Sequence, residues 1–329
     1  MKKKDVGMLL GGTVLGMSAV MTGAAWALIR GYFTRRKPHK TNPGQIETVD
    51  DMHMDYLRRK SISTIQRQDI EEIGITSRDG LLLHGHYVHN LESGRLPGDP
   101  VNVVILSHGY GGTGYKDLAV FSDFYIKEGY DILIIDQRTH GRSDGQYITF
   151  GAREHEDMKL WVDKVIQMAG QDCRILLHGW SMGAATVYLA AADHPAPQVR
   201  GVVFDCGYAV SEAQLLNEAQ AVSKLPKALL WYVLQFLKPL CAVFCAFSLN
   251  EAAPLFVASD MRLPIFFVHG DADSVVPYWM GRRLYRATTH APYRDMLTVP
   301  GAEHTFSYVS DKKGYEEGLL ELMKQCGMR

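Results

Sequence analysis

The chain has 329 residues, a length that suits two domains of average size or one large domain. Its 35 Lys and Arg residues nearly balance its 36 Asp and Glu residues, so no strong overall charge would draw it to nucleic acid. The 47% hydrophobic content excludes a disordered or collagen-like chain, and five cysteines are too few for a disulfide scaffold. We therefore expect a globular protein without a nucleic-acid partner.

The first predicted element is a long uncharged segment. Residues 6–29 are 24 residues without a charge, and a helix of that length spans about 36 Å, enough to cross a hydrocarbon core of about 30 Å. We predict a transmembrane anchor over residues 1–29, followed by a basic tether and a lead-in helix over 30–65. The alternative is a cleaved signal peptide, because Ala25-Trp26-Ala27 resembles a cleavage site. The apolar run is longer than the roughly 7–15 residues usual for such a peptide.

Small and basic residues add two expectations about this anchor. Gly7 with Gly11, and Gly12 with Gly16, could let two anchors pack closely and associate weakly. Basic residues after the segment outnumber those before it, so the positive-inside rule favours a catalytic body on the cytoplasmic face. Unpaired cysteines favour the same side, because thiols survive better in a reducing compartment.

Residues 66–329 are predicted to form one α/β catalytic domain. Strands over 70–76 and 81–88 flank a turn-forming stretch, Ser77 to Gly80. Short, wholly apolar strands then alternate with helices, as expected of a doubly wound, mostly parallel sheet covered on both faces. The further strands are predicted at 101–106, 132–135, 174–177, 199–204, 265–268 and 296–299, and the helices at 118–128, 154–169, 184–192 and 278–287, with a last helix ending near residue 326.

The alternation is interrupted over residues 206–254, which we predict to be an inserted helical lid. Its apolar stretch, 228–249, has the length of a second membrane span, but Lys238 and Pro239 near the middle make a span costly. Its aromatic residues either line an acyl pocket or pack in the core of the lid. They are Trp231, Tyr232, Phe236, Phe244 and Phe247.

A glycine-bounded pentapeptide, Gly179 to Gly183, lies between a predicted strand and a predicted helix. In that context G-x-S-x-G forms a sharp turn that exposes the serine hydroxyl. Glycines suit the outer positions, because side chains there would collide as the strand and the helix close on each other. The start of the helix also favours developing negative charge. Ser181 is therefore the candidate nucleophile.

Serine needs a base and an orienting carboxylate to become a nucleophile. His304 follows the strand predicted at 296–299, and Asp273 follows the strand at 265–268, so both are expected at the same edge of the sheet as Ser181. Two other carboxylates compete for the acid role. Asp271 is two residues away and suits a turn, and Asp205 ends an earlier strand.

A glycine-rich turn, His108 to Gly112, directly follows the strand at 101–106. Such a turn can aim the N–H of Tyr110 at the reacting carbonyl oxygen, where it would join the N–H of Met182 in an oxyanion hole. The simpler interpretation is a tight turn, in which His108 serves the turn geometry.

Other polar groups are interpreted as structural. Asp136 and Arg138 are expected to tie down a loop through a charge-assisted pair, and Cys241 and Cys245 to be small buried residues. Three histidines near 84–89 raise the question of a metal, but no nearby cysteine or carboxylate has ligand spacing. They are His84, His86 and His89. We expect neither a metal nor another cofactor.

Five motifs in this order resemble the α/β-hydrolase superfamily, and most closely its membrane-anchored, serine-aminopeptidase-like hydrolases. They are H-G-x-G-G at 108–112, D-x-R-x-H-G-x-S at 136–143, G-x-S-x-G at 179–183, H-G-x-x-D-x-V-V-P at 269–277 and G-A-x-H at 301–304. The resemblance covers residues 69–329. It implies Ser181 as nucleophile, Asp273 as acid and His304 as base, with backbone donors at Tyr110 and Met182.

The expected activity is hydrolysis of an ester or related acyl bond through an acyl-enzyme, without a cofactor. The apolar lid and the anchor favour substrates with an acyl chain, which could come from the bilayer. The alternatives are a serine peptidase or amidase, and a non-catalytic binding protein on a hydrolase fold.

Overall fold

The computed structural model describes residues 20–34 and 48–329. The expected anchor over 1–29 and the expected tether and lead-in helix over 30–65 therefore lie partly outside the described residues. Within them, residues 20–28 are helical, and the helix continues into one π-helical turn, η1 (Ile29–Phe33).

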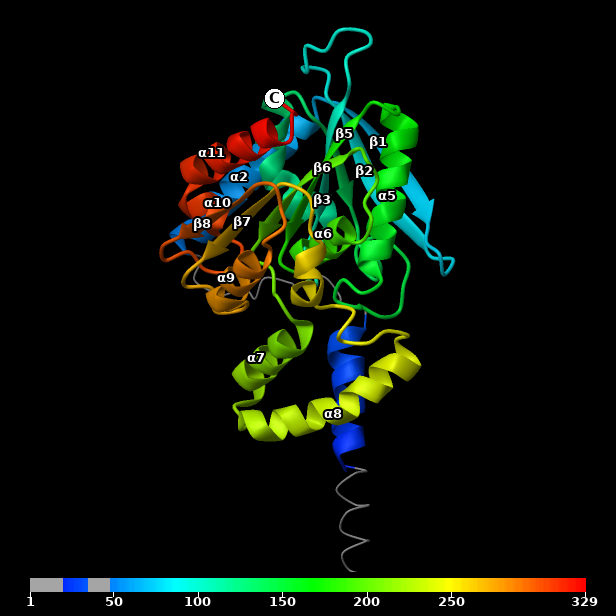
Figure 1. Cartoon of the computed structure of the whole chain (residues 1–329), viewed down its shortest axis with the longest axis vertical. Coiled ribbons are helices and arrows are strands. Elements are labelled where there is room, and N and C mark those ends of the chain that lie inside the picture. The colour runs from blue at the N-terminus through cyan, green and yellow to red at the C-terminus, as the bar shows by residue number, and fades with distance from the viewer. Residues whose placement is uncertain (1–19, 35–47) are drawn as a thin grey trace, which may run out of the picture.

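One eight-stranded sheet, in the order β1-β2-β4-β3-β5-β6-β7-β8, forms the centre of the described structure (Figure 1). β2 is antiparallel to both β1 and β4, and all other neighbours are parallel. The strands are β1 (Asp69–Thr76), β2 (Leu82–His89), β3 (Asn102–Ser107), β4 (Asp131–Ile135), β5 (Arg174–Trp180), β6 (Val199–Asp205), β7 (Ile265–Gly270) and β8 (Arg294–Val299). The predicted α/β class and the mostly parallel sheet are confirmed.

The central strands are covered on both faces, which explains why they are apolar throughout. In β3, Val103 and Ile105 belong to one buried cluster and Val104 and Leu106 to the other, because successive side chains point to opposite faces. The first cluster is closed by α5 (Glu154–Ala169), α6 (Met182–Ala192) and α9 (Tyr278–Ala287). The second is closed by α2 (Val49–Ile65), α4 (Ser122–Lys127) and α11 (Lys312–Gln325).

The helix predicted at 118–128 is broken into three short pieces. They are α3 (Gly114–Leu118), the 3-10 turn η2 (Ala119–Phe121) and α4. All three residues of η2 are buried. Three consecutive buried residues do not fit the single apolar stripe of an ordinary surface helix, and the tighter turn accommodates them. The strand predicted at 174–177 is longer than expected and runs to Trp180, directly before Ser181.

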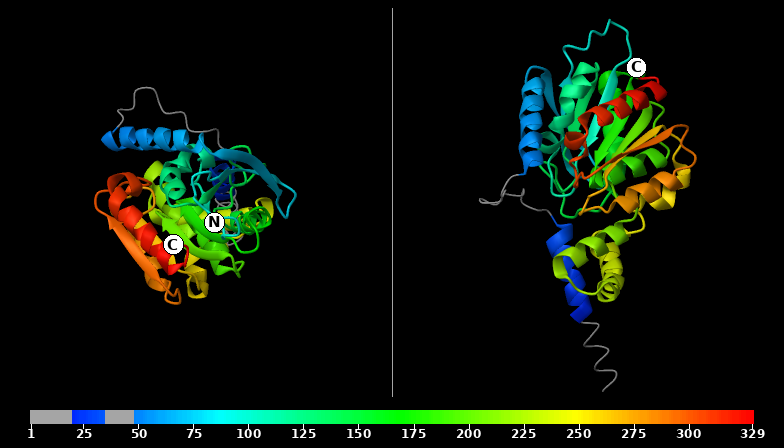
Figure 2. Two further views of the ribbon diagram at one scale, coloured as in Figure 1. Left: turned by 90° about the horizontal axis from the view of Figure 1, so that it is seen from above. Right: turned by 90° about the vertical axis from the view of Figure 1, so that its left-hand side faces the viewer.

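The inserted segment forms two long helices, α7 (Ser211–Ser223) and α8 (Lys227–Phe244), followed by the 3-10 helix η3 (Pro254–Asp260). α7 and α8 lie at one end of the sheet, and the helix at residues 20–28 lies beside them (Figures 1 and 2). Ala25, Ile29 and Phe33 of the N-terminal segment are buried in the same cluster as Val233 and Leu237 of α8.

The described parts of the expected tether are packed against the body. Phe33 is buried in the core cluster, and α2 buries Met54, Leu57 and Ile65. α2 lies where the lead-in helix was expected, and its apolar side chains are removed from water there. Phe33, at the start of the expected tether, is likewise buried in the core.

Within residues 20–34 and 48–329, one helix has the length and apolar composition of a membrane span. It is α8, and only 28% of its apolar window is buried. Pro239 lies inside this helix.

Candidate active site

Ser181 lies in a strained turn between β5 and α6. Its backbone has φ 57° and ψ −118°, a conformation that L residues rarely adopt. The flanking glycines are required by close packing. A Cβ on Gly179 would lie 2.2 Å from the carbonyl oxygen of Gly183, and a Cβ on Gly183 would lie 2.0 Å from that of Ser107. The sequence pattern thus has the geometry of a nucleophile elbow.

Ser181, His304 and Asp273 form a continuous chain of hydrogen bonds. His304 Nε2 lies 2.9 Å from Ser181 Oγ, and His304 Nδ1 lies 2.7 Å from Asp273 Oδ2. Because a carboxylate only accepts hydrogen bonds, Nδ1 carries the proton, which leaves Nε2 to accept the serine hydroxyl. His304 is therefore set to remove the proton of Ser181.

Asp273 is held ionised by its hydrogen-bond donors. Burial alone would raise its pKa, but bonds from His269 and His304 lower the pKa of Asp273 to about 2. Its Oδ1 accepts the backbone N–H groups of Val275 and Val276 at 2.9 and 2.8 Å. His269, at the end of β7, is a partner that the sequence did not single out, although it begins the motif that contains Asp273.

The two competing acids occupy other positions. Asp271 accepts the backbone N–H of Gly301 at 2.7 Å, which is the expected turn role. Asp205 is buried and accepts the hydroxyl of Tyr315 at 2.9 Å. Burial raises the pKa of Asp205 to about 6. Of the three acids, Asp273 is the one hydrogen-bonded to His304.

The glycine-rich turn after β3 lies directly against Ser181. A Cβ placed on Gly109 would come within 3.1 Å of Ser181 Cβ, so the neighbouring Tyr110 is next to the serine. Met182 follows Ser181 at the start of α6. The two expected oxyanion donors therefore come from segments that meet at the nucleophile.

Buried histidines fix the shape of this turn. The ring of His108 contacts the carbonyl of Gly109 at 2.7 Å and accepts the N–H of Gln137 at 3.0 Å. His140 accepts the N–H of Gly111 at 3.0 Å through Nε2, and burial lowers the pKa of His140 to about 4, which keeps the ring neutral. His108 has the expected turn role. His140 was missed by the sequence reasoning, because nothing in its local pattern pairs it with a turn 29 residues earlier.

The segment after β4 is tied down by charge, as expected, but with other partners. Arg138 forms paired hydrogen bonds with Asp157 at 2.6 and 2.8 Å and with Asp79 at 3.0 and 3.1 Å. Asp136 instead accepts the backbone N–H groups of Gly114 and Arg142 at 2.9 and 3.0 Å. These bonds fix the segment that supports the glycine-rich turn.

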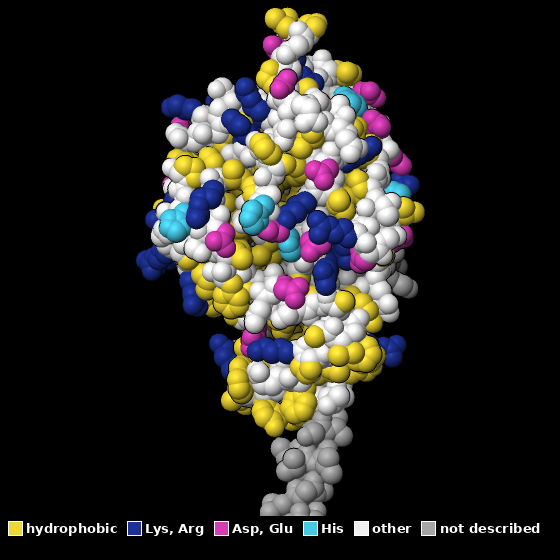
Figure 3. Space-filling model, turned by 45° about the vertical axis from the view of Figure 1, so that its right-hand side comes forward, with side chains coloured by type: hydrophobic (Ala, Val, Ile, Leu, Met, Phe, Trp, Pro, Cys, Tyr) yellow, Lys and Arg dark blue, Asp and Glu magenta, His cyan; other side chains and the backbone are white. Residues whose placement is uncertain are grey.

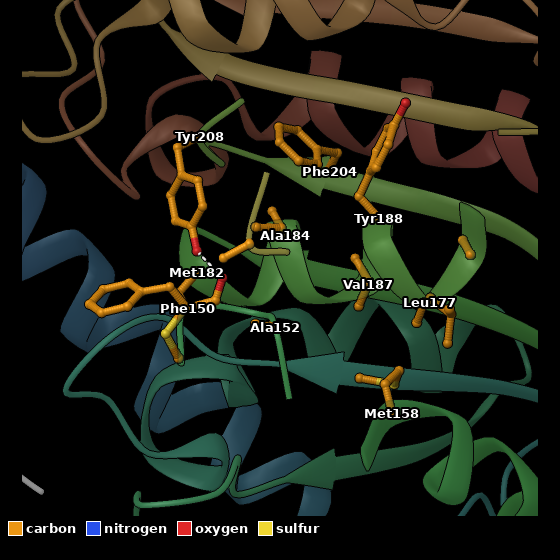
Figure 4. Packing of buried hydrophobic residues seen from close by; sticks show 14 of the residues in the cluster. Phe150, Ala152, Met158, Leu177, Met182, Ala184, Val187, Tyr188, Phe204 and Tyr208 are labelled. Atoms are coloured by element: carbon orange, nitrogen blue, oxygen red, sulfur yellow. Dashed lines mark hydrogen bonds between the residues drawn. The ribbon is translucent and has the colours of Figure 1, made fainter. Parts of the chain in front are cut away.

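The N-terminal segment also reaches the site. The ring of Tyr32 stacks on Tyr110 with a centroid distance of 4.7 Å, and its carbonyl accepts the Tyr110 hydroxyl at 2.6 Å. Phe150 stacks on both tyrosines. Figure 4 shows Phe150 beside Met182 and Tyr208, whose hydroxyl donates to the Phe150 carbonyl at 2.6 Å. A row of stacked aromatic rings thus borders the expected oxyanion donors.

The lid aromatics only partly follow either expectation. Phe247 is buried against Phe33, with ring centroids 6.1 Å apart, whereas Trp231, Tyr232 and Phe244 are about half exposed, at 51%, 45% and 47%. Phe244 nevertheless packs on Trp26, with ring centroids 4.7 Å apart, and Phe236 is partly buried against the core. Trp231 and Tyr232 stay on the exposed part of α8.

Within the described residues, three side chains beside the catalytic serine could in principle bind a metal ion. Cys206, Asp273 and His304 place a ligand atom each within 4.8 Å of one another. Burial raises the pKa of the Cys206 thiol well above its usual range, and the other two residues are hydrogen-bonded to each other. A protonated thiol is a poor metal ligand, so the donor set fits a proton-transfer pair better than a metal centre.

Comparison with known proteins finds similarity to one hydrolase family over part of the chain. Residues 98–243 match the model of the serine aminopeptidase, S33, hydrolase family. The chain is 27% identical over 227 residues to the uncharacterized protein YqkD of Bacillus subtilis, covering 69% of this chain and 72% of that protein. It is 22% identical over 258 residues to the uncharacterized protein YfhR of Escherichia coli, covering 77% and 80%.

Among solved structures, the esterase Pf2001 of Pyrococcus furiosus superposes with a TM-score of 0.63 at 21% identity, covering 89% of this chain and 98% of the esterase. This likeness shows the shared fold. Together, the family match over residues 98–243 and this shared fold support the assignment of the chain as an α/β hydrolase, a hydrolytic enzyme.

Proposed function

We propose that this enzyme is a membrane-anchored serine hydrolase that cleaves an ester or a related acyl bond of an apolar substrate through an acyl-enzyme. The observation that carries the proposal is the hydrogen-bonded chain from Ser181 through His304 to Asp273, with distances of 2.9 and 2.7 Å. No step of this chemistry requires a cofactor.

The reaction begins when Ser181 Oγ attacks the substrate carbonyl carbon and His304 Nε2 takes the hydroxyl proton. Asp273 stabilises the resulting imidazolium through Nδ1–H. The backbone N–H groups of Tyr110 and Met182 stabilise the negative oxygen of the tetrahedral intermediate. His304 then protonates the leaving group, and water repeats the sequence on the acyl-enzyme to release the acid and restore Ser181.

An apolar acyl group suits the residues near the serine. Met182, Phe150 and Tyr208 lie together beside the elbow (Figure 4), and Phe33 packs on Phe150 with ring centroids 5.1 Å apart. Such surroundings favour burial of a hydrocarbon chain by about 0.8 kcal/mol per CH₂. The esterase named above shares this fold, which supports an ester as the bond cleaved.

Peptide or amide hydrolysis is the second candidate, and the description of the matching family as a serine aminopeptidase favours it. The same triad can attack an amide, so the reactive residues do not distinguish the two. We expect rates on acyl esters to rise with chain length and to exceed those on aminoacyl amides. A preference for aminoacyl amides would reverse the assignment.

The membrane anchor over residues 1–29 is also part of the proposal. The described part supports an anchor over a cleaved signal, because Ala25-Trp26-Ala27 lies within a helix and Ala25 is buried against the core. A signal peptidase would have to unfold this helix to reach the cleavage site. A mature protein that begins at Leu28 would contradict the anchor.

A fluorophosphonate probe tests the catalytic proposal directly, since it reacts only with an activated serine. We expect labelling of the wild type and none of Ser181→Ala, with Ser307→Ala, a buried serine in α10 (Ser307–Ser310), as a control that keeps its label. A correctly folded wild type that takes up no label and hydrolyses no ester would favour a binding protein on a hydrolase fold.

A further inference from the structure

Helix α8 is apolar on two opposite sides. Its inner side buries Leu230, Val233, Leu234, Leu237 and Cys241, which recur at the spacing of one helical stripe. A lid helix in water would carry polar residues on the other side. Instead, the exposed residues away from this stripe include Trp231, Tyr232 and Val243.

The exposed apolar surface continues from the end of α7 through the turn into the start of α8. Val222 of α7 is 87% exposed, Leu225 of the turn 43% and Leu229 of α8 38%. Figure 3 shows hydrophobic side chains gathered at this end of the molecule. We call the outer face of α8 and this turn the lid surface. Its large hydrophobic members are Val222, Leu225, Leu229, Trp231, Tyr232 and Val243.

The lid surface carries exposed lysines. α8 contains no carboxylate, Lys227 begins it, and the exposed Lys224 precedes it in the turn. Lys238, the other lysine of α8, is offset by Glu212 of α7 at 2.9 Å. An apolar face rich in Trp and Tyr, bordered by lysines, is typical of helices that lie in the interface of an anionic membrane.

The N-terminal segment reaches the same end of the molecule. The helix at residues 20–28 packs on α8 through Trp26 and Phe244, whose ring centroids are 4.7 Å apart. The chain before it is uncharged back to Val6. In Figures 1 and 2, α8 runs across this helix rather than along it. If the uncharged segment enters a bilayer, α8 therefore lies along the bilayer surface.

We propose that the lid surface docks on the lipid bilayer into which the N-terminal segment is inserted, so that the catalytic site receives its acyl substrate from that bilayer. The inference rests on the proposed membrane anchor and serine hydrolase activity. A direct path of contacts links the two regions, because Phe33 packs on both Phe247 of the lid segment and Phe150 beside Met182.

Lipid contact of α8 can be measured in the full chain. All five native cysteines are buried, so an introduced surface cysteine can be labelled selectively with an environment-sensitive fluorophore. We choose Val243→Cys on the lid surface and Leu96→Cys as the control. Leu96 is 70% exposed in the loop between β2 and β3, and that loop lies at the opposite end of the molecule from α8 (Figure 1). Both proteins are reconstituted in vesicles of phosphatidylcholine and phosphatidylglycerol.

We expect a blue-shifted emission for the label at 243, with strong quenching by lipids that carry a nitroxide on the acyl chain, and neither effect at 96. Equal and weak quenching at both positions would overturn the proposal. A blue shift at 243 that persists without lipid quenching and disappears as protein is diluted in the vesicles would also overturn it, since a second copy would then cover the surface.

A double variant, Trp231→Glu with Val243→Glu, tests the functional consequence. We expect its rate on a water-soluble short-chain ester and its fluorophosphonate labelling to match the wild type, and its rate on a long-chain ester held in vesicles to fall about tenfold or more. An unchanged rate on the vesicle ester would contradict docking. Failure of the wild type to cleave either ester would refute the proposed hydrolase activity, and the lipid-quenching result would still decide the docking.

Discussion

At the scale of residues, the place of a carboxylate in the fold decides which role it takes. Asp271 and Asp273 are two residues apart in one loop, yet the first holds a backbone N–H and the second holds His304. Asp273 also receives two backbone N–H groups and a bond from His269, at 3.4 Å. Four donors aimed at one buried carboxylate keep it charged.

Replacing this carboxylate by an amide tests its role. In Asp273→Asn the amide can no longer hold the required tautomer of His304, and we expect kcat to fall by about 10³–10⁴-fold. Asp271→Asn is the matched control, because its remaining amide oxygen can still accept from Gly301, and it should keep most of the activity. Steady-state kinetics on a short ester measures both. Comparable losses in the two variants would mean that Asp273 is not the acid.

Asp205 is a second buried carboxyl, and its effect on the free energy of unfolding depends on pH. Burial raises its folded-state pKa from 3.8 to about 6, so the folded state holds this proton more tightly than the unfolded state does. The contribution of this proton to the free energy of unfolding is complete below pH 3.8 and is lost as the pH rises through about 6.

We therefore expect Asp205→Asn, which stays neutral, to gain stability relative to the wild type as the pH rises. The gain between about pH 4 and pH 7 should reach at most about 3 kcal/mol. Urea unfolding in detergent, followed by circular dichroism at both pH values, measures the difference. A difference that is the same at both values would show that Asp205 does not titrate as described.

At the scale of elements, the site depends on backbones that approach without side chains between them. β5 and α6 meet at Gly179 and Gly183, and the turn after β3 fits against Ser181 at Gly109. The segment after β4 then holds that turn through Gln137 and His140. Three loops from neighbouring strands thus fix one another at the carboxyl edge of the sheet.

Gly183→Ala should disrupt this arrangement. The added Cβ would lie 2.0 Å from the backbone oxygen of Ser107, which cannot swing away as a side chain can. We expect a loss of about 3 kcal/mol or more in the free energy of unfolding, or failure to fold. Gly23→Ala is the control, because nothing lies within 4 Å of its added Cβ. A wild-type melting temperature for Gly183→Ala would contradict the close contact.

At the scale of the whole molecule, the N-terminal segment is part of the folded body as well as the proposed anchor. Ala25, Ile29 and Phe33 are buried with the lid, and Tyr32 stacks beside the expected oxyanion donor. Gln214 of α7 also donates to the carbonyl of Val275, next to the loop that carries Asp273. The lid, the N-terminal segment and the catalytic loops are therefore packed as one structure.

Two truncations separate anchoring from packing. Deletion of residues 2–19 should leave the melting temperature in detergent nearly unchanged. The shortened protein should be extracted from membranes by an alkaline wash that leaves the full chain bound. Deletion of residues 2–34 should in addition lower the melting temperature by about 10 °C or more, because Ile29 and Phe33 leave cavities. Equal melting temperatures for the two proteins would show that the segment does not contribute to the core.

The sequence by itself determined the class of fold, the order of strands and helices, and the positions of Ser181, Asp273 and His304 at strand ends. These follow from local patterns: wholly apolar runs for strands covered on both faces, and short motifs after them. The hairpin at β1 and β2 and the exact span of α5 also follow from local patterns.

Only the tertiary structure decided which carboxylate binds His304, which buried histidines support the glycine-rich turn, and which way the lid aromatics face. It also brought Tyr32 to a site 78 residues further along the chain. The physical reason is that these outcomes depend on contacts between distant segments. α8 shows it most clearly, because a helix with apolar residues on more than one side does not reveal in its sequence which side is covered by protein.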